Sequence, residues 1–261
     1  FDIRESNINI SSEEASAIAD RRRGIGCDQV LLLNYSENHD AEMIVYNSDG
    51  SKAETCGNGL RCVVSYLSRL LKRKKINILS GKFNILAKVL DDGMIEVNVG
   101  APEIKWNKIP LAYKVDTLHL ELSRELHGKV CLSDPVAVSM GNPHAVFFVE
   151  KIEEIDLETF GPGLENDPLF PNKANISIVS IEQRNLLRVR VWERGAGLTE
   201  ACGSAACASL VAGVRRGLCD KESTVILPGG KLNISWLEDK SINVIGPAVF
   251  VYEGKYNFTK K

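Results

Sequence analysis

The chain has 261 residues, 44% of them hydrophobic, and a formal net charge of −2. This length is long for one compact domain and suits two domains of roughly 100–150 residues each. The near-neutral charge excludes a strongly basic nucleic-acid-binding protein, no apolar stretch approaches the ~20 residues of a membrane span, and no signal peptide opens the sequence. We therefore expect a cytoplasmic globular protein with no nucleic-acid or membrane partner.

The cysteines and histidines argue against a disulfide framework and against a metal site. Seven cysteines are an odd number in a chain without a secretory signal, so we expect thiols. No pair of cysteines has C-x-x-C spacing, and the histidines are scattered, at His39, His119, His127 and His144. Neither arrangement is typical of zinc ligands, so no metal is predicted.

The first hundred residues alternate between helix and strand signals. A serine at 11 or 12 followed by Glu14 predicts a helix start, and Gly24 predicts the end of the chain's first helical segment. A polar turn cluster follows at 47–51. The apolar runs in this part predict five strands, at residues 30–33, 43–46, 76–79, 83–90 and 94–99.

The segment Cys56-Gly57-Asn58-Gly59 stands between that turn cluster and an apolar run in which Val63, Val64 and Leu67 have helical spacing. We therefore expect the sulfur of Cys56 at the mouth of a helix. A helix N-terminus presents unpaired N–H groups and about half a positive charge. Such a site is predicted to bind a carboxylate and to lower the pKa of the thiol.

The second half repeats this order. Strands are predicted at 136–139, 145–149, 176–181 and 187–192, and the prolines at 162, 168 and 171 indicate a loop-rich excursion with no counterpart in the first half. A second motif, Cys202-Gly203-Ser204, then leads into another apolar helical run that Gly217 closes. Downstream cysteines follow each motif, and we expect both, Cys62 and Cys207, to pack in helix cores.

The spacing of these features indicates a duplication. Cys202 follows Cys56 by 146 residues, and Lys231 follows Lys82 by 149. We therefore expect an α/β chain of two pseudo-symmetric domains that face each other across a cleft, with the active site between them. The expected domains are 1–113, to which a C-terminal strand at 250–261 returns, and 114–249.

Two opposed cysteines suit one kind of chemistry. Inverting a carbon centre without a prosthetic group requires a base on one face and an acid on the other, and a thiolate and a thiol supply this pair. Backbone N–H groups at the two helix N-termini would stabilise the developing carbanion by binding the neighbouring carboxylate. The matched cysteine motifs therefore predict paired acid/base chemistry.

Several motifs in chain order carry a resemblance to diaminopimelate epimerase. They are Gly24–Gln29, Asn47–Ser51, Cys56–Cys62, Gly141–His144, Glu193–Gly195 and Thr199–Ser204. The resemblance implies two pseudo-symmetric domains, each a β-barrel-like sheet around a central helix. It also implies a cytoplasmic bacterial homodimer that converts LL- to meso-diaminopimelate for lysine and peptidoglycan synthesis.

The resemblance assigns roles to individual residues. Cys56 and Cys202 would be the catalytic acid and base, no cofactor is needed, and His144 would tune a thiol. The remaining residues would bind a small amino-acid substrate: Gln29, Asn47, Gly57, Asn58, Asn142, Asn175, Glu193, Arg194, Gly203 and Ser204. Among them, Arg194 would pair with the distal carboxylate and Glu193 with an ammonium group.

Some features depart from the family, and two other functions stay open. The family opens with a strand carrying Gly-Asn-Asp-Phe and an active-site asparagine, and this chain is expected to start after that strand at Phe1. A racemase of the proline-racemase type shares the expected fold, but its Asp-Arg-Ser-Pro-Cys-Gly-Thr motif does not occur here. A redox-responsive binding protein, switched by a Cys56–Cys202 disulfide, is the alternative outside the enzymes.

Overall fold

The structure is a computed structural model that describes residues 1–6, 8–53, 56–126 and 129–257. His127 and the last four residues of the expected C-terminal strand lie outside these ranges. The N-terminal half holds two helices and six strands within the described residues: α1 (Ser12–Ala19), β1 (Gln29–Asn34), β2 (Ala41–Asn47), β3 (Lys52–Ala53), α2 (Gly57–Leu71), β4 (Lys75–Ser80), β5 (Phe83–Val89) and β6 (Ile95–Asn98).

The C-terminal half begins with a separate hairpin of β7 (Ser123–Leu126) and β8 (Lys129–Ser133). The other elements of this half follow: β9 (Val136–Ser139), β10 (Pro143–Phe148), η1 (Ile152–Glu154), α3 (Leu157–Glu165), β11 (Asn175–Gln183), β12 (Leu186–Glu193), β13 (Gly197–Thr199), α4 (Gly203–Arg215), β14 (Glu222–Leu227), β15 (Gly230–Trp236) and β16 (Ile242–Gly246).

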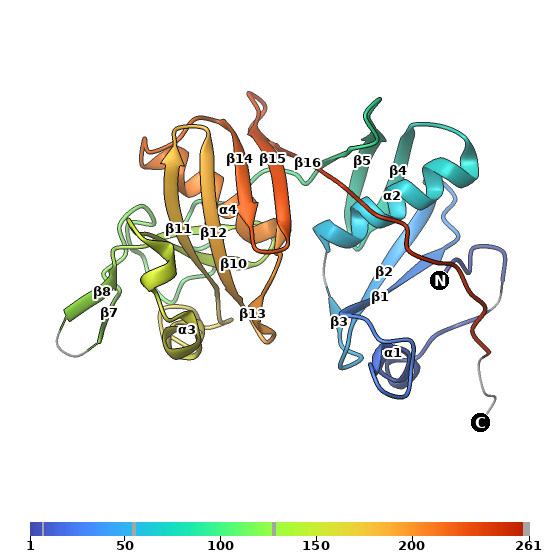
Figure 1. Ribbon diagram of the computed structural model, residues 1–261, viewed down its shortest axis with the longest axis horizontal. Coiled ribbons are helices and arrows are strands. Elements are labelled where there is room, and N and C mark those ends of the chain that lie inside the picture. Colours follow the sequence, from blue (N-terminus) through green and yellow to red (C-terminus); the bar gives the residue numbers. More distant parts are fainter. Residues whose placement is uncertain (7, 54–55, 127–128, 258–261) are drawn as a thin grey trace.

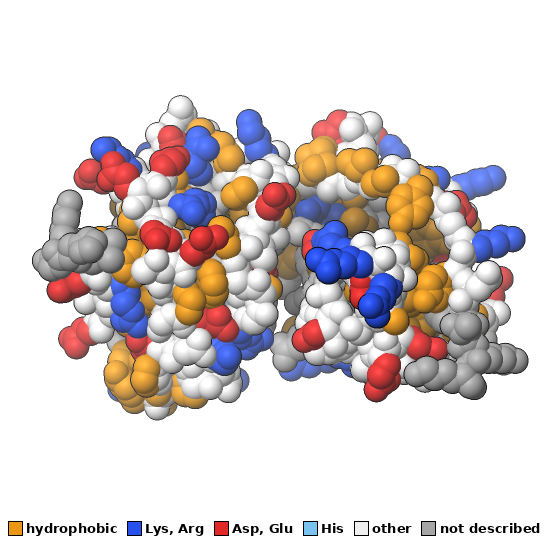
Figure 2. Space-filling model, turned by 60° about the horizontal axis from the view of Figure 1, so that its bottom comes forward, with side chains coloured by type: hydrophobic (Ala, Val, Ile, Leu, Met, Phe, Trp, Pro, Cys, Tyr) orange, Lys and Arg blue, Asp and Glu red, His pale blue; other side chains and the backbone are white. Residues whose placement is uncertain are grey.

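One sheet runs through both halves of the molecule. Its strand order is β1-β2-β4-β5-β6-β16-β15-β14-β12-β11-β10-β9, with β3 and β13 attached to β2 and β12. The halves join where β6 pairs antiparallel with β16, with Val97 opposite Val244. Figure 1 shows the two lobes side by side, and in Figure 2 they meet along a narrow seam.

The pairing within each half follows the same scheme. β1 is antiparallel to β2 and β2 is parallel to β4, just as β11 is antiparallel to β12 and β12 is parallel to β14. The parallel pairs β2/β4 and β12/β14 are connected through helices α2 and α4, as a parallel connection requires. The α/β fold class is therefore confirmed, and the predicted strands are found at their expected places.

The two helices differ in how completely strands enclose them. Every residue of α4 from Ala205 to Gly213 is buried, and this helix contacts β9, β10, β11, β12, β14 and β15. Helix α2 buries one face, including Val64 and Leu67, and leaves Cys62 exposed. The expectation that Cys62 packs in a core is therefore wrong, because it lies on the outer face of its helix; Cys207 is buried as expected.

The expectation of a loop-rich excursion is also wrong, because this segment contains helix α3. Asp156 caps this helix by accepting hydrogen bonds from the backbone N–H of Thr159 at 3.1 Å and from its hydroxyl at 2.6 Å. Leu157, Phe160 and Leu164 pack in the core, so tertiary packing maintains a helix despite its internal Pro162. Helix α3 is also the counterpart of α1, because each packs on the antiparallel strand pair that precedes the cysteine motif, β1 and β2 for α1 and β11 and β12 for α3. Their last residues, Ala19 and Glu165, lie 146 positions apart.

Two segments cross between the halves. Ile109 and Leu111 belong to the core of the C-terminal half, which favours a boundary nearer Gly100, and the expected division at 113/114 stays a prediction. The C-terminal tail runs back over α2 towards the N-terminus (Figure 1), and Tyr256 packs edge-on against Phe1. Its described residues from 250 to 257 form no strand.

Candidate active site

Each motif cysteine caps a helix of the duplicated unit. Cys56 is the N-cap of α2, and its Sγ accepts a hydrogen bond from the N–H of Gly59 at 3.1 Å. Cys202 is the N-cap of α4, and its Sγ lies 3.4 Å from the hydroxyl oxygen of Ser204. Both cysteines have extended backbones, as N-cap residues do, so each sulfur lies at the positive end of a helix dipole as predicted.

The two helix N-termini meet at the seam between the halves. A Cβ placed on Gly57 would lie 3.9 Å from the Cα of Gly203, so the glycines leave only backbone at this contact. Asn58 bridges the seam by donating from Nδ2 to the carbonyl oxygen of Ala201 at 3.3 Å. The structure thus brings Gly57, Asn58 and Gly203 together with the two cysteine caps.

Arg61 is a residue of this junction to which the sequence motif assigned no role. It is buried, and its guanidinium donates to the Asn58 side-chain oxygen at 3.0 Å and to the Pro247 carbonyl at 3.1 Å. Burial lowers the pKa of Arg61, and negative charge on Cys62, Cys56 or Cys207 would raise it. The sequence signal for this role was an arginine within an apolar helical run, because a charged side chain is rarely buried there without a partner.

The expected lowering of the thiol pKa values is wrong. Burial raises the pKa of Cys56 and, more strongly, that of Cys202. The N–H groups of Gly59 and Ala205 work in the opposite direction but do not overcome desolvation. The negative charge of Glu193 raises the pKa of both thiols further, so this carboxylate lies within electrostatic reach of both cysteines.

The predicted polar residues of the N-terminal half form one chain of hydrogen bonds. Gln29, at the start of β1, donates from Nε2 to the side-chain oxygen of Asn47 at 3.0 Å. Asn47, at the end of β2, donates to the Ser51 hydroxyl at 3.1 Å. Both side chains are half-buried and lie at the strand ends nearest the Cys56 loop.

The C-terminal half places its polar residues at equivalent positions. Asn175 begins β11, and its side-chain oxygen accepts from the N–H of Arg194 at 3.0 Å. Glu193 ends β12 and accepts a short hydrogen bond from the Thr199 hydroxyl. The pairs Gln29/Asn175 and Asn47/Glu193 are each separated by the same 146 residues as the cysteines. The duplication therefore gives the N-terminal half two amides, Gln29 and Asn47, and the C-terminal half one amide, Asn175, with the carboxylate of Glu193.

His144 and Asn142 form a separate hydrogen-bonded pair in the C-terminal half. His144 is fully buried, and its Nε2 donates to the Asn142 side-chain oxygen at 2.9 Å. Burial, aided by the nearby positive charge of Arg194, lowers the pKa of His144 to about 3. The imidazole is therefore neutral at physiological pH, and it would act on a thiol as a dipole rather than as a cation.

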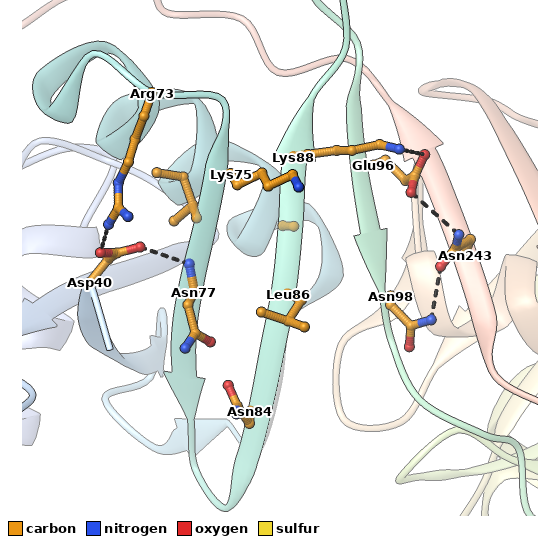
Figure 3. Close-up of a pocket in the computed structure, with 12 residues that line it drawn as sticks. Asp40, Arg73, Lys75, Asn77, Asn84, Leu86, Lys88, Glu96, Asn98 and Asn243 are labelled. Carbon is orange, nitrogen blue, oxygen red and sulfur yellow. Dashed lines mark hydrogen bonds and ion pairs between the residues drawn. The ribbon is translucent and has the colours of Figure 1, made fainter. Parts of the chain in front are cut away.

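Two hollows accompany the site. A cavity of about 130 Å³ borders the first turns of α2 and α4, lined by Gly57, Arg61, Gly203, Ser204 and apolar residues of β5 and β6. A wider groove of about 560 Å³ lies on the outer face of β4, β5 and β6 (Figure 3), where Asp40 pairs with Arg73 and Lys88 with Glu96. The groove contains neither motif cysteine, so we place the chemistry at the helix N-termini.

The residues that the structure describes contain no cluster of three or more His, Cys, Asp or Glu side chains that could hold a metal ion. Among these same residues, no helix is long and apolar enough to cross a membrane.

Solved structures that share this fold include a predicted epimerase, a probable proline racemase and a phenazine biosynthesis protein of the PhzF family. A predicted epimerase from Pseudomonas aeruginosa superposes with a TM-score of 0.65 at 16% identity, covering 95% of this chain and 88% of that one. A probable proline racemase from Agrobacterium radiobacter K84 superposes with a TM-score of 0.62 at 13% identity, covering 91% and 82%. The molecule therefore shares its fold with these proteins.

The sequence narrows this class to one family. The profile of the family described as Diaminopimelate epimerase matches residues 2–105 and 136–256. A diaminopimelate epimerase of Rhizorhabdus wittichii is 42% identical over 94% of this chain and 85% of its own length. One of Acidiphilium cryptum is 41% identical over 98% and 90%. The chain belongs to the diaminopimelate epimerase family.

Proposed function

We propose that this protein interconverts LL- and meso-diaminopimelate by a two-base mechanism in which Cys56 and Cys202 face opposite sides of the α-carbon. The observation that carries the proposal is the meeting of two cysteine-capped helix N-termini at the seam of a duplicated fold. One thiol is deprotonated and removes the α-proton, while the other donates a proton to the opposite face. Exchanging the two protonation states runs the reaction in reverse.

The raised thiol pKa values support this chemistry. The α-proton of an amino acid is very weakly acidic, so a thiolate whose pKa is raised by burial is a stronger base than an ordinary one. The N–H groups at Gly57, Asn58, Gly203 and Ser204 would bind the α-carboxylate and stabilise the negative charge that spreads into it. Fixed backbone dipoles supply this stabilisation without reorganising during the reaction.

We assign the rest of the polar set to the distal end and the amino groups of the substrate. Arg194, whose guanidinium is exposed, would pair with the distal carboxylate, and Glu193 with an ammonium group. Gln29, Asn47, Asn142 and Asn175 would complete the hydrogen bonds of a substrate with two amino and two carboxyl groups. His144 would hold Asn142 in place through its 2.9 Å hydrogen bond.

Deuterium uptake tests the proposed function. In heavy water, the purified protein should incorporate deuterium at an α-carbon of LL-diaminopimelate and produce the meso isomer, whereas L-proline should stay unlabelled. Uptake into proline alone would support a proline-racemase activity instead, and no uptake into either amino acid would contradict an epimerase.

Glu193→Gln tests the electrostatic role of this carboxylate. The negative charge of Glu193 raises the pKa of both thiols, so its loss should lower both values and shift the acidic limb of the kcat/KM profile to lower pH. Glu200→Gln, which changes an exposed carboxylate directly after β13, is the matched control and should leave the profile in place. If the acidic limb of the kcat/KM profile of Glu193→Gln is unchanged or lies at higher pH than that of the wild type, this role is contradicted.

We also propose that the enzyme works as a homodimer in a bacterial cytoplasm. The bacterial origin of the similar proteins and the free thiols of the described cysteines support this setting. Sedimentation equilibrium on the reduced protein tests the assembly: a mass near 28.7 kDa would contradict a dimer.

A further inference from the structure

We infer that Glu165, at the end of α3, is a positioning residue for the turn that presents Glu193 and Arg194 to the substrate. The inference rests on the proposed function, because it takes this turn as the recognition element for the distal end of the substrate. No sequence motif includes Glu165, which lies in the region expected to be a loop without a counterpart.

Both carboxylate oxygens of Glu165 accept hydrogen bonds, one from Gly195 in the turn and one from Trp192 before it. Oε2 accepts from the indole N–H of Trp192 at 2.8 Å, and Oε1 accepts from the backbone N–H of Gly195 at 3.1 Å. The side chain is only 8% exposed, and Lys173 lies 3.8 Å from Oε1. A buried carboxylate with two donors in fixed positions ties both ends of the turn to one helix.

The same helix fixes the Trp192 ring from another direction. A Cβ placed on Gly161 would lie 2.4 Å from the Trp192 ring, so the α3 backbone packs directly against the indole. Beyond the ring, the Arg194 guanidinium donates to the Asn172 carbonyl at 3.0 Å and its backbone N–H donates to Asn175. The segment from α3 to β11 therefore contacts the residues on both sides of Glu193.

The N-terminal half stabilises its equivalent turn in a different way. There, Asp49 lies inside the equivalent turn and accepts from the Ser51 N–H at 2.8 Å and from its hydroxyl at 2.6 Å. At the 146-residue offset, Asp49 corresponds to Gly195, and Ala19 at the end of α1 corresponds to Glu165. In the C-terminal half the stabilising carboxylate thus belongs to the neighbouring helix rather than to the turn. Gly195 adopts φ of 76°, a left-handed conformation that a side chain would disfavour.

Glu165→Gln is the test, with Glu158→Gln as the matched control on an exposed position of the same helix. A carboxamide has one acceptor oxygen, so its NH₂ group must face either the Trp192 or the Gly195 N–H. We expect amide hydrogen exchange at Gly195 to become about tenfold faster or more. The KM for LL-diaminopimelate should rise about five- to tenfold, with kcat within about twofold of wild type, because distal binding weakens while both cysteines stay in place.

The two measurements separate the possible results. Unchanged exchange at Gly195 would overturn the contact itself, and faster exchange with an unchanged KM would overturn the positioning role. A fall in kcat with KM unchanged would also overturn it, because the effect would then lie at the cysteines. If the wild-type protein failed to act on diaminopimelate, the proposed function would fail, and the exchange measurement would still decide whether Glu165 holds the turn.

If Glu165→Gln does not fold, Trp192→Phe is the second variant. It keeps an aromatic ring against Gly161, removes the indole N–H and replaces the two-ring indole with a single ring. We expect a smaller rise in KM in the same direction, because Gly195 keeps its bond to Glu165, and no rise at all would count against the inference.

Discussion

Cys56→Ala and Cys202→Ala should each reduce epimerisation by at least about 100-fold, because each face of the α-carbon needs its own proton carrier. The fold should be little affected. Cys56 is only half-buried, and although Cys202 is 6% exposed, alanine retains its Cβ at the start of α4. Turnover of purified variants, measured from both LL- and meso-diaminopimelate, checks the loss, and thermal unfolding checks the fold.

Cys62→Ala is the control for these variants. It removes another thiol of α2 that lies on the exposed face, six residues after Cys56, so its activity should stay near that of the wild type. If either Cys56→Ala or Cys202→Ala kept more than about a tenth of wild-type turnover, a loss of less than about 1.4 kcal/mol of transition-state stabilisation, the two-base mechanism would be wrong.

His144 should make the protein sensitive to acid. Its pKa is lowered from 6.5 to about 3 by burial and by Arg194. Above pH 6.5 the ring is neutral in both the folded and the unfolded state, so it has no effect there. As the pH falls below this value the unfolded state binds a proton that the folded state refuses, so the free energy of unfolding should fall by about 2 kcal/mol between pH 7 and pH 5.

Urea unfolding at the two pH values measures this loss. In His144→Gln, which carries no titrating ring but keeps a side-chain donor for Asn142, most of the His144 contribution should disappear. His119→Gln changes an exposed histidine that faces Asp134 at 3.1 Å, and it should retain the steep dependence of the wild type. Equal pH dependence in wild type and His144→Gln would contradict the assignment of acid sensitivity to this residue.

The asymmetry of the site has a simple origin in the duplication. Copying one β/α unit places a cysteine at each of two helix N-termini, and the sheet that joins at β6 and β16 brings those ends together. The residues around the cysteines have then diverged, so that Asn47 on one side corresponds to Glu193 on the other. A substrate that reacts at one end while its other end is only bound needs such divergence, whereas the proton transfers need only the symmetric pair of thiols.

The sequence by itself determined the elements whose signals are local. A serine at 11 or 12 followed by Glu14 predicted the helix start, which the structure places at the capping box of Ser11 and Glu14. The alternating runs predicted the strands of both halves. The cysteine motifs placed Cys56 and Cys202 at helix N-caps, since a polar turn followed by an apolar helical run is a local pattern. The similar offsets, 146 residues between the cysteines and 149 between Lys82 and Lys231, then related the two halves.

Only the tertiary structure decided the features that depend on burial and on distant partners. The prolines and glycines of this segment predicted a loop where α3 lies, because the helix is stabilised by the packing of Leu157, Phe160 and Leu164 rather than by helix propensity. The thiol pKa values rise rather than fall, since desolvation exceeds the effect of the helix N–H groups and depends on everything packed around the sulfur. The partners of Glu165 and Arg61 lie up to 30 and 186 residues away along the chain, and no local pattern encodes contacts at that separation.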